Sequence, residues 1–168
     1  MQTQIPGIRI RKARDEDAPG ILECLREAFE EFQSRYTAEG FLDTVLTTET
    51  LRGRLEKMTV FVAIDSANRV VGTIACHVLS SAEGHLRGMA VLRSMRGSGI
   101  AAQLLREAEA ELRLCRCARV TLDTTEPLER AMRFYEKNGY RRSGKTSAFF
   151  GMRLIEYKKP LRHGDAMS

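Results

Sequence analysis

The sequence has no hydrophobic run long enough to cross a membrane. A clean apolar run in its first half, Val60–Ile64, is far shorter than the roughly 20 residues of a transmembrane helix. Residues 1–18 also lack the apolar segment of a secretory signal, and they soon become charged. We therefore expect a cytoplasmic location and no membrane partner.

The sequence also lacks a dense Lys/Arg block and any recognisable DNA- or RNA-binding motif. Its net charge of +5 and isoelectric point near 9.2 come from basic residues spread along the chain. A mild basic excess indicates either simple solubility or an anionic ligand, such as a polyphosphate cofactor or a nucleic acid. Without a basic block or a motif, we expect no nucleic-acid partner.

Spacings typical of metal-binding cysteines are missing as well. Of the four cysteines, Cys115 and Cys117 form a C-x-C pair with no second ligand pair nearby. Free thiols are the expectation for an intracellular chain, because disulfides form mainly in oxidising compartments. We therefore expect reduced cysteines and no metal site.

No repeat, low-complexity tract or interdomain linker interrupts the chain. A length of 168 residues with 43% hydrophobic content fits one globular domain with a full core. We expect a single domain over residues 1–168, with its core at about 8–157 and a polar tail at 158–168.

The hydrophobic pattern predicts a mixed α/β fold. Apolar runs and alternating patterns predict strands at 8–13, 59–65, 70–79, 85–91, 119–123, 140–144 and 149–157. Three- and four-residue spacing predicts helices after a cap at Asp15 or Asp17, over 36–58 with a break near 47–48, over 99–114, and from Pro127 to Asn138-Gly139. The order strand, helix, strand over 85–123 predicts one parallel strand pair in an otherwise antiparallel sheet.

A glycine-containing turn joins the strand at 85–91 to the helix at 99–114. It reads Arg96-Gly97-Ser98-Gly99-Ile100-Ala101. Glycines let a ligand approach the backbone closely, and a helix start offers unpaired N–H groups and the positive end of the helix dipole. Arg96 adds a cation that can pair with phosphate in a forked geometry. The turn therefore predicts a phosphate-binding site.

Two motifs together resemble the GNAT superfamily of acyl-CoA-dependent N-acetyltransferases. Within 89–105, Arg96, Gly99 and Ala101 meet the signature Arg/Gln-x-x-Gly-x-Gly/Ala. Residues 131–140 are similar to the family's Ala-x-x-Phe/Leu-Tyr-x-x-x-Gly-Phe/Tyr. The resemblance covers 8–157 and implies a mixed, centrally splayed sheet of about seven strands flanked by about four helices.

The same resemblance implies how acetyl-CoA, the expected co-substrate, binds. The strand end would hold the pantetheine arm and the turn would hold the pyrophosphate; the residues implied are Met89, Ala90, Val91, Arg96, Gly97, Ser98, Gly99, Ile100 and Ala101. The N–H of Val91 is a candidate donor to the thioester oxygen. Tyr135 occupies the position of the general acid at the sulfur, and a phenol can protonate a thiolate because its pKa is the higher of the two.

The general base is open between His85, Glu83 and a water molecule. Several family members carry a carboxylate on the strand before the turn, at the position of His85. Histidine titrates near neutral pH and can accept a proton directly or through water. Glu83 lies on the same face if the strand reaches it, or in the preceding turn if it does not. His77 and His163 have no supporting context.

One position departs from the family pattern. Where many members have an asparagine that contacts the cofactor, this sequence has Leu128. The polar contact is then missing or comes from another residue, such as Thr124 or Thr125.

The acceptor specificity of this fold comes largely from the first two helices and the last hairpin. Here these are 29–50 and 143–150, with acidic and aromatic residues that suit a cationic amine: Glu30, Glu31, Tyr36, Glu39, Phe41, Asp43 and Phe149. Glu30 and Glu31 can equally form a solvated helix face. We expect direct acetyl transfer to a primary amine of a small molecule, peptide or protein. A non-catalytic acyl-CoA sensor and a homodimer are left open.

Overall fold

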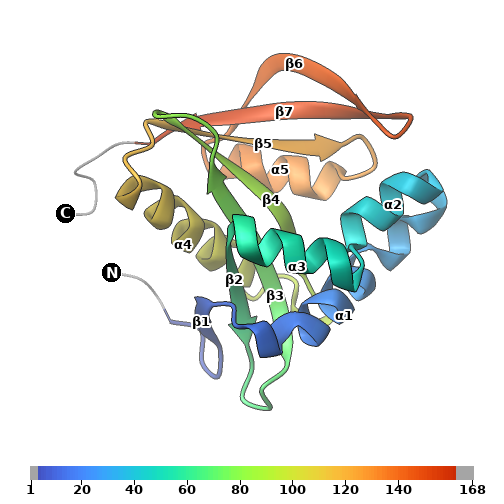
Figure 1. The fold of residues 1–168 in the computed structure, drawn as a ribbon, viewed down its shortest axis with the longest axis vertical. Helices are drawn as coiled ribbons and strands as arrows, with labels where there is room; N and C mark the ends of the chain where they lie inside the picture. The colour runs from blue at the N-terminus through green and yellow to red at the C-terminus, as the bar shows by residue number, and fades with distance from the viewer. Residues whose placement is uncertain (1–3, 162–168) are drawn as a thin grey trace.

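The computed structural model describes residues 4–161, which form one mixed sheet with helices on both faces (Figure 1). Within this range seven strands are formed: β1 Arg9–Lys12, β2 Thr59–Ile64, β3 Val70–Val78, β4 Glu83–Val91, β5 Arg119–Thr125, β6 Arg141–Phe149 and β7 Met152–Pro160. The α-helices of the same range are α1 Ala18–Phe29, α2 Ala38–Val45, α3 Thr48–Lys57, α4 Ile100–Leu114 and α5 Glu129–Lys137. Short 3-10 turns are η1 Asp15–Asp17, η2 Glu30–Arg35 and η3 Arg93–Met95. The mixed α/β prediction is confirmed.

The sheet has the strand order β1-β2-β3-β4-β5-β7-β6. Strands β4 and β5 are parallel, as the intervening helix α4 predicted, and the other neighbours are antiparallel. The parallel pairing ends at Leu86 opposite Leu122, although β4 continues to Val91 and β5 to Thr125. The two strands therefore separate in the middle of the sheet, which is the splay that the resemblance to the GNAT superfamily implied.

Two helical layers cover the sheet. Figure 1 shows α1, α2 and α3 on the face toward the viewer and α4 and α5 on the opposite face. Helix α4 packs its apolar side, including Leu104 and Leu105, against the sheet. Side chains of this size each contribute about 1.5–3 kcal/mol when they are fully buried, so α4 anchors the turn that precedes it.

A buried carboxylate links α4 to the C-terminal strand. Glu109 is almost fully buried, and it accepts hydrogen bonds from the Tyr140 hydroxyl at 2.7 Å and from Lys159 Nζ at 3.0 Å. A buried charge is tolerated when it is paired and hydrogen-bonded in this way. The contact fixes α4 against β7 and the segment after α5.

Several predicted boundaries differ from the structure. The predicted helix over 36–58 begins later, at Ala38, and its expected break near 47–48 is present, where Thr47 caps α3 by accepting from Thr50 N–H at 3.2 Å. Helix α5 begins at Glu129 rather than Pro127, because Leu128 N–H closes a turn onto Thr125 (3.0 Å) first. Asp17, one of the two predicted cap residues, does precede α1, but its side chain forms no hydrogen bond to the helix. Its carboxylate instead accepts from Arg11 and from the backbone N–H of Arg14.

The last hairpin turns later than predicted. Strand β6 continues through Gly144, which sits at a bulge with a φ of 91°, and the turn is Phe150-Gly151, with φ values of 47° and 81°. Such positive angles are typical of a tight two-residue hairpin turn. Strand β7 also runs beyond Tyr157 to Pro160, and Leu161 is buried and donates its N–H to Ala118 (2.8 Å). The rest of the predicted tail, 162–168, lies outside the described residues.

Candidate active site

The glycine turn leads directly into α4. Gly97 and Gly99 adopt φ values of 81° and 90°, which only glycine reaches without strain. The first helical hydrogen bond joins Gln103 N–H to the Gly99 carbonyl at 3.1 Å. The N–H groups of the helical residues before Gln103, Ile100 to Ala102, therefore have no partner within the helix. A Cβ at Gly97 would meet nothing within 4 Å. The turn is therefore an open cradle of backbone donors, as phosphate binding requires.

The end of β4 offers free backbone groups to the gap beside it. Leu92 N–H bonds the Val71 carbonyl at 2.9 Å, and Val91 lies opposite Gly72 on β3. In an antiparallel ladder alternate residues face the partner strand, so the backbone groups of Val91 face away from β3. Because β5 has separated from β4 at this level, these groups are available to an extended ligand. Ala90, in contrast, directs its backbone to β3.

A cavity of about 1270 Å³ runs from the glycine turn through the strand gap to the outer half of β4. Of the residues that the sequence nominated for catalysis and cofactor binding, all except Ser98 line it; they are His85, Met89, Ala90, Val91, Arg96, Gly97, Gly99, Ile100, Ala101 and Tyr135. Of those nominated for the acceptor, Tyr36, Asp43 and Phe149 line it, whereas Glu30, Glu31, Glu39 and Phe41 do not. The Ser98 hydroxyl bonds the Met95 carbonyl instead. The fold thus brings two motifs about 40 residues apart in sequence to one space.

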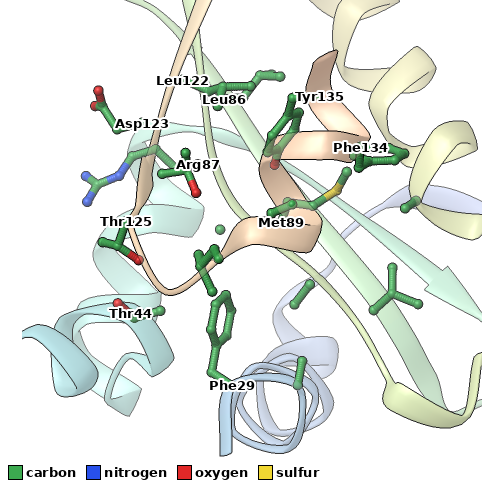
Figure 2. A pocket seen from close by; sticks show the side chains of 18 of the residues that line it. Phe29, Thr44, Leu86, Arg87, Met89, Leu122, Asp123, Thr125, Phe134 and Tyr135 are labelled. Atoms are coloured by element: carbon green, nitrogen blue, oxygen red, sulfur yellow. The ribbon is translucent and has the colours of Figure 1, made fainter. Parts of the chain in front are cut away.

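Figure 2 shows the labelled lining residues in two groups. Met89, Phe134 and Tyr135 lie on one side of this view, and Arg87, Asp123 and Thr125 on the other. Phe134 and Tyr135 are in edge-to-face contact at 5.4 Å. The cavity therefore has an apolar wall from α5 and a polar wall from the outer parts of β4 and β5.

Tyr135 is placed to act as an acid. It is buried on α5, and its ring packs edge-on against Tyr140 at 5.7 Å. Its hydroxyl forms no hydrogen bond to any residue between 4 and 161, and burial raises its pKa well above the usual value. The phenol therefore keeps its proton at neutral pH and can donate it to a ligand in the cavity.

His85 faces the cavity from β4. Its Nδ1 lies 2.8 Å from Thr121 Oγ1, its Nε2 lies 3.6 Å from Asp123 Oδ2, and its ring contacts His77 at 5.8 Å. Burial, followed by the charges of His77 and Arg87, lowers the pKa of His85 to about 4. The imidazole is therefore neutral near pH 7, where it can accept a proton but is a weak base.

The other base candidate is held by an ion pair. Glu83 is the first residue of β4 rather than part of the preceding turn, and it lines the cavity. Its Oε2 accepts from Arg119 Nε at 2.9 Å. This ion pair directs one carboxylate oxygen of Glu83 to Arg119, so His85 is the better placed group.

Arg96 forms an ion pair with a carboxylate of η2. Glu31, in η2, contacts Arg96 directly and also lies 3.1 Å from Arg93 Nη2. The hydrogen bond from Arg96 lowers the pKa of Glu31 below its usual value. Glu31 is therefore neither a free surface charge nor an acceptor contact. It neutralises the cation that the sequence assigned to phosphate.

Thr124 offers a polar contact beside Leu128, which has none to offer. Leu128, Thr124 and Thr125 all line the cavity. The Thr125 hydroxyl is bonded to Tyr36 at 2.6 Å, whereas Thr124 Oγ1 is buried with no hydrogen-bond partner among residues 4–161. Buried polar atoms are nearly always bonded. Thr124 is therefore the better candidate for the contact that the family makes through asparagine.

Sequence reasoning missed part of the polar wall. Arg54, Arg87, Asp123 and Glu156 line the cavity, and so does His77, which had no supporting context in the sequence. These residues come from α3, β3, β4, β5 and β7, so no local motif contains them. The one available signal was the alternation of β4, which places Arg87 on the same face as His85. His163 lies outside the described residues.

Comparisons with known proteins agree with this geometry. Residues 20–140 match the model of the acetyltransferase (GNAT) family. The chain belongs to the GNAT family. A search of curated protein sequences gives no match.

Solved structures of this family are similar over nearly the whole chain. A GNAT-family acetyltransferase from Staphylococcus aureus Mu50 is 20% identical, with a TM-score of 0.77 over 92% of this chain and 99% of the other. PaiA N-acetyltransferase from Thermoplasma acidophilum, in complex with coenzyme A, is 19% identical, with a TM-score of 0.76 over 91% and 98%. A GNAT acetyltransferase from Elizabethkingia anophelis with acetyl-CoA bound is 15% identical, with a TM-score of 0.67 over 93% and 99%. At such identities the likeness establishes the GNAT fold.

Two kinds of feature are absent from residues 4–161. No helix in that range is long and apolar enough to cross a membrane. The same part of the chain contains no group of three or more histidine, cysteine or acidic residues arranged to hold a metal ion.

Proposed function

We propose that this GNAT-family protein transfers an acetyl group from acetyl-CoA directly to a primary amine, within a ternary complex. The observation that carries the proposal is the continuity of one cavity. It joins the phosphate cradle at Gly97 and Gly99, the strand gap beside Val91 and Tyr135, and the polar wall at His85 and Asp123. The complexes of two similar structures with coenzyme A and acetyl-CoA support the cofactor half of the proposal.

The residues of the cavity fit acetyl-CoA in chemistry and in order. The unpaired N–H groups at the start of α4 suit the pyrophosphate, and the backbone groups of Val91, which face away from β3, suit the amides of the pantetheine arm. Met89 lines the same cavity. Thr124 supplies a buried hydroxyl that needs a partner. Acetyl-CoA itself would supply an acetyl group activated as a thioester.

In the proposed transfer, different groups of the protein carry out different steps. The amine nitrogen forms a bond to the acetyl carbon while the carbon–sulfur bond breaks. Val91 N–H stabilises the negative charge on the carbonyl oxygen. Tyr135 gives its proton to the departing sulfur, and His85 takes the proton that the nitrogen loses. A weak base suffices for this last step, because the nitrogen becomes strongly acidic once it has bonded to the acetyl carbon.

Direct transfer is favoured over a covalent acyl-cysteine. None of the four cysteines lines the cavity, and Cys24, Cys76 and Cys117 are buried elsewhere. Burial raises the pKa of Cys24 and of Cys76 to about 12, which leaves too little thiolate to attack a thioester. Initial-rate kinetics should therefore give intersecting lines when both substrates are varied, whereas parallel lines would contradict a ternary complex.

The proposal is tested by measuring thiol release from acetyl-CoA with a panel of primary amines, and by detecting the acetylated product by mass spectrometry. Tyr135→Phe should lower kcat by about a hundredfold or more while changing the Kd of CoA little. Tyr140→Phe is the matched control, since it removes a hydroxyl that bonds Glu109 outside the cavity. It should reduce stability but retain turnover. Tight CoA binding without thiol release for any amine would instead favour an acyl-CoA sensor.

A further inference from the structure

Arg54 is a cation without a partner at the acceptor end of the cavity. It lies on α3 and lines the cavity, yet its guanidinium has no hydrogen bond and no ion pair with any residue between 4 and 161. Burial, followed by the charge of Arg87, lowers its pKa to about 10, so it is still protonated at neutral pH. A half-buried guanidinium normally bonds a carboxylate or a carbonyl.

The backbone of β4 makes room for this guanidinium. Gly88 has a φ of 62°, and a Cβ there would lie 2.4 Å from Arg54 Nη1. The register between β3 and β4 shifts at this point, where Arg87 pairs with Ala75 but Ala90 pairs with Thr73. The bulge and the missing side chain together hold the Arg54 charge against the strand that leads to the thioester gap.

Neighbouring charges do not neutralise Arg54. The charge of Asp43 on α2 raises the pKa of Arg54 slightly, but this carboxylate lies 3.6 Å from Arg87 Nη2 and forms its ion pair with that second arginine. His77 is the other titratable group nearby, and burial, followed by the charges of Arg87 and Arg54, lowers its pKa, which favours the uncharged ring. The α3 side of the cavity therefore carries one excess positive charge, which suits a ligand group with one negative charge.

The opposite side of the same wall carries negative charge. Asp123 and Glu156 are register partners on β5 and β7, and both line the cavity. Burial, followed by the charge of Glu156, raises the pKa of Asp123, as expected for two carboxylates facing each other with too few cations. A substrate ammonium would relieve this repulsion. It would also lie beside His85, whose Nε2 is 3.6 Å from Asp123 Oδ2.

We infer that the acceptor is a small amino acid, whose carboxylate binds Arg54 and whose amine is directed toward Asp123 and His85. The inference rests on the proposed acetyl transfer and specifies its second substrate. A small acceptor is favoured because two hydrogen bonds join separate segments of the chain at the acceptor end of the cavity. Tyr36 bonds Thr125 at 2.6 Å, and Thr37 Oγ1 bonds the Phe150 carbonyl at 2.7 Å. These bonds tie the segment before α2 to β5 and to the last hairpin.

The test compares acids with their own amides as acceptors. The pairs are L-alanine and L-alaninamide, β-alanine and β-alaninamide, and 4-aminobutyrate and 4-aminobutanamide, which vary the distance between amine and carboxylate. For the best chain length, kcat/KM should favour the acid. Arg54→Gln should reduce the acid-to-amide ratio by about tenfold to a hundredfold, the usual effect of losing a hydrogen bond between charged groups. Comparing ratios between variants cancels the different pKa values of the amines.

Two further variants keep the result specific. Arg54→Lys retains the charge and should keep part of the preference for the acid. Arg52→Gln removes an exposed charge from the same helix, outside the cavity, and should leave the ratio unchanged. Thermal unfolding of each variant checks that its fold is intact.

Calorimetry separates this inference from the proposed function. Each acid and amide is titrated into the protein saturated with CoA, which requires no turnover. Tighter binding of an acid, lost in Arg54→Gln, would support the carboxylate site even if no amine were acetylated. Equal binding of acids and amides to the unaltered protein, or a preference that Arg54→Gln leaves unchanged, would overturn it.

Discussion

The two ends of the cavity offer different groups to a ligand. At the glycine turn the donors are mainly backbone N–H groups, and the cation beside them, Arg96, is neutralised by Glu31. At the acceptor end the groups are side chains of both signs, and Arg54 has no partner within the described residues. A backbone cradle recognises any suitably placed phosphate, whereas a set of opposed charges selects one arrangement of amine and anion. The cofactor end is therefore generic and the acceptor end specific.

The largest effect is expected when the cofactor end of the cavity loses the positive charge of Arg96. Arg96→Glu places a second carboxylate beside Glu31 at the phosphate cradle, and CoA should bind about a hundredfold more weakly or worse. Calorimetry with CoA measures the change. Arg106→Glu, an exposed charge reversal on α4 outside the cavity, should have little effect. An unchanged affinity for Arg96→Glu would mean that backbone groups alone bind the phosphate.

His85, at the acceptor end, should make the stability of the protein depend on pH. The pKa of His85 is lowered to about 4 in the folded protein, from 6.5, so between these values the unfolded chain binds the additional proton. Stability is therefore fully present above pH 6.5 and is lost as the pH falls toward 4. From pH 7 to pH 5 this group should cost about 2 kcal/mol.

Urea unfolding at the two pH values measures this loss, and His85→Gln should show a correspondingly flatter pH dependence. His77→Gln is the matched comparison; burial lowers the pKa of His77 too, but His77 is less deeply buried than His85, so its effect should be smaller. If His85→Gln keeps the full pH dependence of the parent protein, His85 is not held neutral by its surroundings, and its role as a base available at neutral pH must be abandoned.

The contrast between the ends also explains how far the sequence could be interpreted. The phosphate turn is local: Arg96, Gly97 and Gly99 are adjacent in sequence, and their chemistry follows from the strand and helix on either side. The parallel pair was predictable for the same reason, because α4 must cross over between β4 and β5. Tyr135 could be placed only through resemblance, since its helix pattern alone indicated a core residue.

The acceptor end could not be predicted because tertiary structure assembles it. Arg54 reaches the cavity only because Gly88 adopts a positive φ at a bulge, and neither residue signals this locally. Asp123 and Glu156 meet through the pairing of β5 with β7, across more than one intervening element. Glu31 was interpreted as an acceptor residue or a solvated charge, but its partners, Arg93 and Arg96, lie in the cofactor turn.

The smallest effect should come from removing the carboxylate that competes with phosphate. Glu31→Gln frees Arg93 and Arg96, whose pairs with Glu31 are partly exposed and individually weak. CoA should therefore bind about twofold to tenfold more tightly, because its phosphates no longer displace an ion pair. Calorimetry at low ionic strength measures the gain, and Glu30→Gln, an exposed neighbour that forms no ion pair with residues 4–161, is the control. Weaker CoA binding in Glu31→Gln would mean that Glu31 orients Arg96 for the phosphate instead of competing with it.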